Sequence, residues 1–343
     1  MFEELFERWD GEQAVVRYDR ESGGWIFVCV HSTVLGPAAG GTRLRVYATP
    51  ADGLADAMKL SRAMTVKWAG ANLPSGGGKA VLAVPELPTG DARRELLLRY
   101  GDVVQSLGGL YRTAGDMNIT PNDLDVVHER CDWVYGTTTG GGNSGRGTAI
   151  AVHAGLEASA EHVFGSPDLK GRSVLVQGAG AVGEVLVRLL HDDGADVLVS
   201  DVDEARARAT GATVISPADV YDTECDIYSP CAVGGTLNAG TIPRLRCKIV
   251  GGSANNQLAE PEDAARLHER GILYAPDFII NAGGIIQLYL LEDRGASEDE
   301  MQRALRGVGD TLRDIFARGG DPATAAEQLA AERIAQKRAE AVA

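Results

Sequence analysis

The stretch Ser173-Val174-Leu175-Val176-Gln177-Gly178-Ala179-Gly180-Ala181-Val182-Gly183 decides the fold. Its first five residues are typical of a buried strand, and a GxGxxG pattern follows at once and opens a helix expected over 183–191. A second expected strand, residues 196–200, ends at Asp201, 23 residues beyond the first glycine. This order of strand, glycine turn, helix and strand predicts a dinucleotide-binding unit. A glycine turn that binds no ligand is the alternative.

The residue types in this turn suit a pyrophosphate. Gly178 permits a tight turn, Gly180 lets backbone amides approach the phosphates, and Gly183 lets the helix pack closely on the strand. The helix N-terminus adds positive partial charge. Asp201 would accept hydrogen bonds from ribose hydroxyls and repel a 2′-phosphate, which favours NAD over NADP. The cofactor contacts expected here are Gly178, Gly180, Ala181, Val182, Gly183 and Asp201.

Further strands are expected near 226–228, 248–250 and 272–274, so the sequence predicts an α/β protein with a doubly wound parallel sheet. Before it, residues 1–135 alternate strand-like runs, such as 25–30 and 80–84, with helical patterns, such as 53–68.

The glycine-rich segment 136–147 separates these two regions. Because such a composition holds regular structure poorly, we place the domain boundary there. We interpret the segment as a hinge against a ligand in a cleft between the domains, with a passive surface linker as the alternative. The predicted domains are a substrate-binding and oligomerisation domain, 1–135 plus a C-terminal helix at about 320–343, and an NAD-binding domain, 148–319.

Composition excludes several classes of function. The 343 residues include 33 Lys and Arg against 48 Asp and Glu, a formal net charge of −15. Such a field repels nucleic acids and anionic membrane surfaces. The five cysteines are widely spread without a CxxC pattern, which is typical of buried thiols in a reducing compartment. The acidic segment 1–7 lacks the features of a signal peptide, and the longest apolar stretch, 278–291, is interrupted by polar residues and glycines, so we expect a cytoplasmic protein.

Two lysines stand in unusual surroundings. Lys67 ends a largely apolar helix, and Lys79 follows Gly76-Gly77-Gly78 and begins a strand of Ala and Val. Surface lysines are the alternative interpretation. The glycines would let a ligand approach closely, and burial beside another cation favours the neutral form of a lysine. We therefore expect Lys79 to act as a general base.

Three further polar residues are candidates for the same chemistry. Asp116 lies in a segment with little strand or helix character, where a simple turn aspartate is the alternative. Asn255 and Asn256 follow a buried strand, which places them at the carboxyl edge of the sheet, where ligands bind. No cluster of histidines or carboxylates has metal-ligand spacing, so no metal site is expected, and no Ser-His-Asp arrangement can be argued.

Several motifs together resemble the glutamate/leucine/phenylalanine/valine dehydrogenase family over nearly the whole chain. The matching stretches are Leu35–Arg43, Asn72–Lys79, Val174–Gly183, Gly251–Leu258 and Ile272–Gly284. Within the family, the sequence looks most similar to actinobacterial phenylalanine dehydrogenases.

The resemblance implies NAD-dependent oxidative deamination of a hydrophobic L-amino acid to its 2-oxo acid and ammonia, and the reverse reductive amination. It implies that Lys79 is the general base and that Asp116 holds the amine and transfers a proton. It also implies a homo-oligomer. Lys67 and Asn256 would hold the substrate carboxylate near the backbone of Gly40 and Gly41, with Asn255 as the alternative to Asn256. Further cofactor contacts are expected from Thr148, Asn255 and Asn281.

The resemblance also suggests the wall of the side-chain pocket, formed by Ala39, Ala114, Ile285 and Leu288. The glutamate branch has a lysine at the position of Ala39, so a side-chain carboxylate is not expected. Ala39 leaves room for an aromatic ring and favours phenylalanine, whereas Ile285 resembles the branched-chain enzymes, so leucine or valine is the alternative. A non-catalytic NAD-binding sensor is an alternative of another class, although Lys79 and Asp116 are both present. A 2-hydroxy-acid dehydrogenase is not favoured, because no histidine base stands in a strand-end motif.

Overall fold

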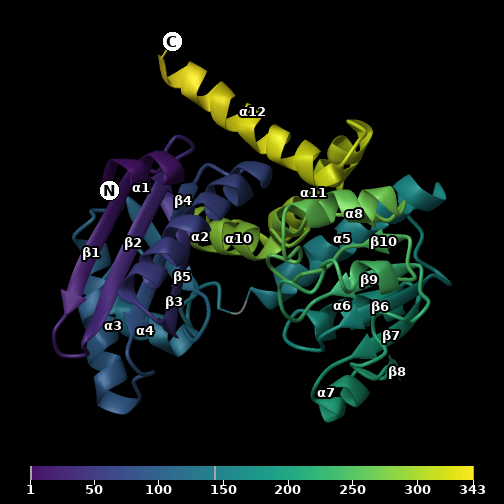
Figure 1. Ribbon diagram of the computed structural model, residues 1–343, viewed down its shortest axis with the longest axis horizontal. Coiled ribbons are helices and arrows are strands. Elements are labelled where there is room, and N and C mark those ends of the chain that lie inside the picture. Colours follow the sequence, from purple (N-terminus) through teal and green to yellow (C-terminus); the bar gives the residue numbers. More distant parts are fainter. Residues whose placement is uncertain (1, 143, 343) are drawn as a thin grey trace. The chain divides into compact units, whose positions relative to one another are not determined.

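The structure, a computed structural model, describes residues 2–142 and 144–342 (Figure 1). The chain forms two compact units, neither of which is continuous in sequence. Unit 1 comprises Met1–Asn143, Leu291–Asp293 and Ala330–Ala343, and unit 2 comprises Ser144–Leu290 and Arg294–Leu329.

Unit 1 is built on a five-stranded mixed sheet with the order β1-β2-β4-β3-β5. Strand β1 pairs antiparallel with β2 and β2 with β4, whereas β3 runs parallel to both β4 and β5. The strands are β1 Gln13–Asp19, β2 Gly24–Ser32, β3 Ala38–Val46, β4 Gly76–Val84 and β5 Tyr111–Gly115, and the helices are α1 Phe2–Trp9, α2 Pro50–Gly70, α3 Gly90–Gln105 and α4 Pro121–His128.

The two faces of this sheet pack against different helices. Val81 and Ala83 of β4 form one apolar cluster with Trp9 and with residues of α2, whereas Ala80 and Leu82 belong to a second cluster with residues of α3 and α4. Side chains alternate between the faces of a strand, so odd-numbered residues of β4 point to the α2 face. Lys79 is one of them.

Unit 2 contains a six-stranded parallel sheet with the order β11-β10-β9-β6-β7-β8. The chain returns to the other side of β6 after β8, which makes the sheet doubly wound and confirms the predicted fold class. The strands are β6 Ser173–Gln177, β7 Asp196–Ser200, β8 Thr213–Val214, β9 Ile227–Pro230, β10 Ile249–Val250 and β11 Leu273–Tyr274.

Helices complete the second half of the chain. They are α5 Gly145–Phe164, α6 Gly183–Asp192, α7 Glu204–Ala209, the 3₁₀ helix η1 Ile242–Arg244, α8 Glu262–Glu269, α9 Asp277–Ile280, α10 Gly283–Leu288, the π-helix η2 Tyr289–Asp293, α11 Glu298–Ala317 and α12 Pro322–Val342. None of the helices in the described residues is long and apolar enough to cross a membrane.

Two later segments of the chain are held in unit 1 by hydrogen bonds. The Glu292 carboxylate accepts from the backbone amides of Gly136 (2.8 Å) and Gly141 (2.7 Å). Arg333 of α12 donates to the carbonyl oxygens of Ala69 (2.9 Å) and Gly70 (2.7 Å) at the end of α2. The carbonyls at a helix C-terminus lack partners within the helix, so the arginine satisfies two of them.

The triple glycine before Lys79 is itself part of a strand. Strand β4 begins at Gly76, so Lys79 lies within the strand and does not begin it as predicted. A Cβ at Gly77 would collide with Thr65 of α2, and a Cβ at Gly78 would lie 2.6 Å from the Tyr111 ring. Glycine is used here for close packing on both faces of the strand.

The segment 136–147 shows the same departure from the prediction. Helix α5 begins at Gly145, inside the stretch that was expected to lack regular structure. A Cβ at Gly147 would lie 2.5 Å from Gln287 Oε1 and 3.0 Å from the carbonyl oxygen of Gly283, so this glycine lets α5 approach α10.

The segment before Asp116 is also regular, because residues 111–115 form strand β5.

Candidate active site

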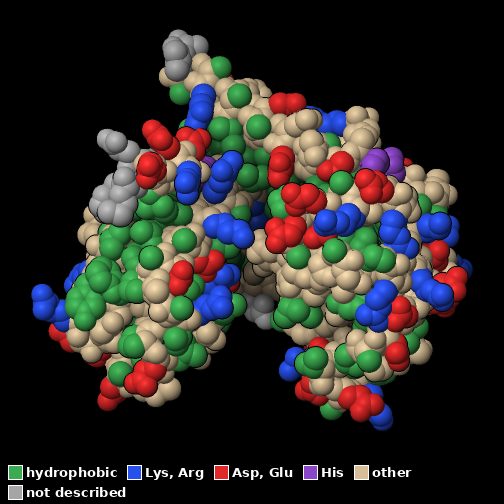
Figure 2. Space-filling model, viewed as in Figure 1, with side chains coloured by type: hydrophobic (Ala, Val, Ile, Leu, Met, Phe, Trp, Pro, Cys, Tyr) green, Lys and Arg blue, Asp and Glu red, His purple; other side chains and the backbone are tan. Residues whose placement is uncertain are grey.

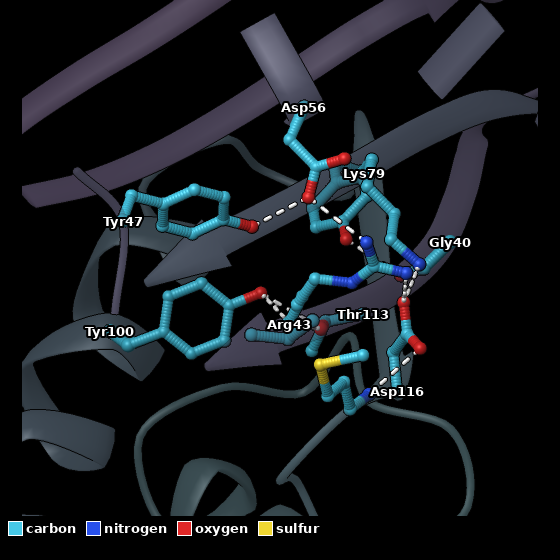
Figure 3. A network of polar contacts seen from close by, with 11 residues as sticks. Gly40, Arg43, Tyr47, Asp56, Lys79, Tyr100, Thr113 and Asp116 are labelled. Atoms are coloured by element: carbon cyan, nitrogen blue, oxygen red, sulfur yellow. Dashed lines mark hydrogen bonds and ion pairs between the residues drawn. The ribbon is translucent and has the colours of Figure 1, made fainter. Parts of the chain in front are cut away.

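A buried lysine and an aspartate form the centre of the candidate site in unit 1 (Figure 3). Lys79, only 6% exposed, forms an ion pair through Nζ with Oδ2 of Asp116. Asp116 follows the last residue of β5, and its Oδ1 accepts a hydrogen bond from the amide of Met117 (2.7 Å). The fold therefore brings together the two residues that were predicted to carry the chemistry, although they stand 37 positions apart.

The surroundings of Asp116 favour the carboxylate. Burial acts to raise the pKa of Asp116, but the charges of Lys79 and Arg43 and the Met117 amide outweigh it and hold the pKa below its ordinary value. The side chain is therefore ionised at neutral pH and is a hydrogen-bond acceptor.

A second cation, Arg43, contacts the same carboxylate and was not predicted. Its Nη2 lies 3.4 Å from Asp116 Oδ2, and its Nη1 donates to Asp56 Oδ2 of α2 at 3.0 Å. In the sequence this arginine was only the last residue of a motif. The one signal for it in the sequence is its spacing from Ala39. The two residues are four positions apart on β3, so their side chains lie on the same face of the sheet.

The backbone of β3 passes close to the ion pair. Trp68 Nε1 donates to the carbonyl oxygen of Ala39 (2.9 Å), and Tyr111 donates its hydroxyl to that of Gly40 (2.6 Å). A Cβ at Gly41 would lie 2.6 Å from the carbonyl oxygen of Gly115 and 3.0 Å from Cβ of Asp116. The predicted substrate contact Gly41 thus lies beside Asp116, because only glycine fits between β3 and the end of β5 at this position.

The remaining predicted residues of unit 1 lie on α2, β3 and β5. Lys67 lies half-buried in the last turn of α2, immediately before Trp68. Ala114 pairs with Gly41 across the β3–β5 ladder, and Ala39 is fully buried.

The glycine turn of unit 2 has the geometry expected for a pyrophosphate site. Gly178 adopts φ +103°, which L side chains rarely adopt, and a Cβ at Gly183 would overlap the backbone of Gly178. Around Gly180 the space is open, with nothing within 4 Å of an added Cβ. Ala181 and Val182 form the turn that leads into α6.

Asp201 stands at the end of β7, beside this turn. Its Oδ2 accepts from the amide of Ala179 and its Oδ1 from that of Asp203, both at 2.8 Å. Burial acts to raise the pKa of Asp201, but these amides hold it below its ordinary value, so the group is ionised. A pocket of about 630 Å³ opens here, lined by Asp201, Val202, Glu204, Arg208, Val214, Ile215, Ser216 and Pro217.

A second group of predicted residues meets at the carboxyl edge of β10. Asn281, 3% exposed, donates from Nδ2 to Asn255 Oδ1 at 2.9 Å, while its Oδ1 is buried without a hydrogen-bond partner among the described residues. Thr148 lies near the start of α5, and a Cβ at Gly284 would be 3.0 Å from its Oγ1. Because a buried acceptor without a partner is costly, the Asn281 oxygen is suited to the amide of a ligand.

Other predicted residues of unit 2 are less closely engaged. Asn256 is exposed, next to Asn255, with a left-handed backbone (φ +50°). Ile285 and Leu288 are half-buried on α10.

One group of a histidine and two carboxylates does have the spacing of metal ligands. His153 Nε2 lies 2.6 Å from Asp193 Oδ2, and its Nδ1 lies 3.8 Å from Glu157 Oε2. The sequence did not indicate it, because Asp193 is 40 positions away. The hydrogen bond between His153 and Asp193 accounts for the arrangement without an ion, so we assign no metal site.

The fold and the site define a class of protein. A doubly wound sheet with a GxGxxG turn and an adjacent Asp201 is joined in one chain to a unit that buries a lysine–aspartate pair. This combination defines a two-domain amino-acid dehydrogenase.

Comparison with known proteins gives the family. Residues 16–140 match the Glu/Leu/Phe/Val dehydrogenase dimerisation domain, and residues 198–337 match the Glutamate/Leucine/Phenylalanine/Valine dehydrogenase domain. The chain belongs to the Glu/Leu/Phe/Val dehydrogenase family, which confirms the resemblance.

Relatives of known function are similar over nearly their whole length. A leucine dehydrogenase from Thermoactinomyces intermedius is 40% identical, with 98% of this chain and 93% of that protein covered. A valine dehydrogenase from Streptomyces virginiae is 44% identical, with 95% and 94% covered. The crystal structure of L-tryptophan dehydrogenase from Nostoc punctiforme matches with a TM-score of 0.85 and 37% identity, covering 98% of this chain and 99% of that one.

Proposed function

We propose that this protein catalyses the NAD-dependent oxidative deamination of a hydrophobic L-amino acid, with leucine or valine preferred, to the 2-oxo acid and ammonia. The observation that carries the proposal is the buried Lys79–Asp116 pair beside the glycines of β3. The leucine and valine dehydrogenases among the relatives support the aliphatic alternative better than the phenylalanine preference expected from Ala39.

Each residue of the pair has a distinct role in this reaction. The ionised Asp116 accepts hydrogen bonds from the substrate amine and orients it. Lys79, as the general base, takes a proton from the water that adds to the imine carbon. Asp116 accepts a proton from the substrate amine during its oxidation and returns that proton to the departing ammonia. Lys67 and Asn256 would hold the substrate carboxylate, with Asn255 as the alternative to Asn256. Small side chains at Ala39 and Ala114 offer no charge to a substrate side chain, which suits an apolar group.

The residues of unit 2 fit NAD, which when bound supplies the hydride acceptor. The open space over Gly180 suits the pyrophosphate, and the buried Asn281 Oδ1 without a partner suits the carboxamide of the nicotinamide. Thr148 and Asn255 would complete that end of the site. The ionised Asp201 would bind the ribose hydroxyls and disfavour a 2′-phosphate.

We also infer that the protein assembles with copies of itself. The family match over 16–140 is described as a dimerisation domain. Strand β1 is an edge strand, and Figure 2 shows hydrophobic side chains gathered over the β1–β2 hairpin, where Val16 and Tyr18 are 49% and 47% exposed. Apolar side chains on an unpaired edge suit pairing with a second copy.

We infer a cytoplasmic location. All five cysteines are free, which fits a reducing compartment such as the cytoplasm.

The test is a substrate panel with a matched pair of variants. Purified protein is incubated with NAD and single L-amino acids at alkaline pH, and the reduction of nicotinamide is followed. We expect leucine or valine to exceed phenylalanine and tryptophan, and Lys79→Ala to lower kcat by about a thousandfold or more. Lys59→Ala, at an exposed position of α2, is the control and should retain activity. Absence of turnover with every amino acid would support the non-catalytic sensor, and full turnover by Lys79→Ala would refute the mechanism.

A further inference from the structure

Arg43 joins three parts of unit 1 around the ion pair (Figure 3). It projects from β3, reaches Asp116 after β5 with Nη2, and reaches Asp56 on α2 with Nη1. The oxygen that it approaches, Asp116 Oδ2, is the one that also receives Lys79 Nζ. Arg43 therefore contacts the candidate catalytic pair through Nη2, while its Nη1 is bound to Asp56, which we call its anchor.

The anchor is itself fixed by a further hydrogen bond. Tyr47 donates its hydroxyl to Asp56 Oδ2 at 2.5 Å, the same oxygen that accepts from Arg43 Nη1 at 3.0 Å. The Arg43 side chain is only 15% exposed, and within the part of the chain that the structure describes its Nε is buried without a hydrogen-bond partner. The guanidinium is thus held by two carboxylates, one on each side, and its planar shape fixes the angle between them.

The charges in this network balance. The cations are Lys79 of β4 and Arg43 of β3, and the anions facing them are Asp116 after β5 and Asp56 of α2, with the neutral Tyr47 hydroxyl beside Asp56. Without Arg43, Asp116 would face Lys79 alone, and Asp56 would lose its cation. Loss of Arg43 would therefore favour the protonated form of Asp116, because one of the two positive charges that lower the pKa of this carboxyl group would be removed.

We propose that Arg43 is a positioning residue of the active site, which holds the Asp116 carboxylate between Lys79 and the substrate amine and is itself set in place by Asp56 and Tyr47. This proposal rests on the proposed function of Lys79 and Asp116. Arg43 would not touch the reacting atoms. It would act through Asp116, whose orientation is then determined by Lys79, Arg43 and the Met117 amide together.

The experiment compares Arg43→Met and Arg43→Lys with Arg45→Met, an exposed arginine on the same strand whose guanidinium lies 5.3 Å from the Tyr47 ring centroid. We expect Arg43→Met to lower kcat/KM for the best amino acid by roughly 10–100-fold. The acid limb of its pH–rate profile should move to higher pH by roughly 0.5–1 unit, because a cation beside the pair is lost. Arg43→Lys keeps the positive charge, so it should retain part of the lost kcat/KM and show the wild-type acid limb. The kcat/KM of Arg45→Met should stay within about twofold of the wild-type value.

A purely structural role for Arg43 would lower the yield or Tm without moving the acid limb. Should Arg43→Met fail to fold, Asp56→Asn keeps the shape and weakens the anchor, so kcat/KM should fall by a smaller factor. Its acid limb should not move to higher pH, because this variant removes a negative charge and not a positive one. Unchanged values of kcat/KM for both Asp56→Asn and Arg43→Lys would then overturn the proposal, as would an unchanged rate and pH profile for a folded Arg43→Met. Lys79→Ala is assayed in parallel. If it is inactive while Arg43→Met is normal, only the role of Arg43 fails, whereas an active Lys79→Ala refutes the proposed function itself.

Discussion

Asp201 offers a quantitative test of the choice of cofactor. Asp201→Asn keeps the size of the side chain and one acceptor oxygen but removes the charge. In the structure both carboxylate oxygens bind backbone amides, from Ala179 and Asp203, so the charge is fixed in place at the mouth of the pocket. A 2′-phosphate bound there would carry about −1.5 to −2 charges beside the carboxylate.

The magnitude follows from Coulomb's law. At a separation of roughly 5 Å, two unit charges repel by about 0.8 kcal/mol in water and about 3 kcal/mol at an effective dielectric constant of 20. The pocket is open to solvent, so a repulsion of about 1–3 kcal/mol is reasonable, which corresponds to a factor of about 5–150. Loss of part of a charged hydrogen bond to the ribose weakens NAD as well. Asp201→Asn should therefore raise the ratio of kcat/KM for NADP to that for NAD by about 10–100-fold.

The assay measures initial rates with each dinucleotide varied at a saturating concentration of the best amino acid. Asp203→Asn is the matched control: it removes an equal charge two residues away, and asparagine retains the N-cap that Asp203 provides to Ala205 (3.1 Å) and Arg206 (3.2 Å) of α7. Its ratio should change less than about threefold. A ratio for Asp201→Asn within twofold of the wild type, or an equal effect of Asp203→Asn, would refute the assignment.

Two predictions concern stability. Arg99→Met should lower the free energy of unfolding by about 3–5 kcal/mol in urea titrations, because Asp19, 2% exposed, would keep its charge without its partner, whereas Arg94→Met in an exposed ion pair should cost less than about 1 kcal/mol. Burial acts to raise the pKa of Asp19, but Arg99 holds it below its ordinary value, so this stabilisation is present above about pH 4 and is lost as the pH falls through the folded-state pKa. The difference in the free energy of unfolding between the wild type and Arg99→Met should therefore shrink as Asp19 becomes protonated, and a difference that stays constant down to low pH would contradict this. Gly147→Ala should lower Tm by several degrees in a thermal scan, because the added Cβ would lie 2.5 Å from Gln287 Oε1, and an unchanged Tm would show that α5 and α10 can separate at little cost.

Sequence alone predicts those features whose cause is local. The turn from Gly178 to Gly183 can be identified from sequence because a strand, glycines, a helix and an acidic residue follow one another within a short stretch. The structure confirms the doubly wound sheet around it. The continuous apolar run Trp25–Val30 likewise predicts a buried strand, and it lies inside β2.

The features that sequence did not predict have causes elsewhere in the chain. Gly76–Gly78 suggest a break in structure by their own preference, yet they lie in a strand because Thr65 and Tyr111 pack against them. Gly147 lies in a helix for the same kind of reason. Tertiary packing outweighs local preference at such positions, and only the fold shows which neighbour requires the missing side chain.

The candidate site shows the same limit. Lys79 could be connected with Asp116 only through the family resemblance, since nothing between them in sequence links the two. The pairing of Arg43 with Asp56 and Asp116 depends on a strand, a helix and a loop that meet in space, and no periodicity relates those positions. A residue that acts through another residue leaves little trace in a single sequence.

The discontinuity of unit 1 has a consequence for the order in which the protein is made. Unit 1 contains both the first 143 residues of this sequence and the last 14, and its glycine-rich segment is bound by Glu292. A nascent chain that has emerged only as far as α5 therefore lacks Glu292, which binds the amides of Gly136 and Gly141, and Arg333, which caps α2. Unit 2 is fully synthesised before unit 1. Unit 1 as described can therefore be completed only after unit 2 has been synthesised, and a fragment that ends at the glycine-rich segment lacks part of unit 1.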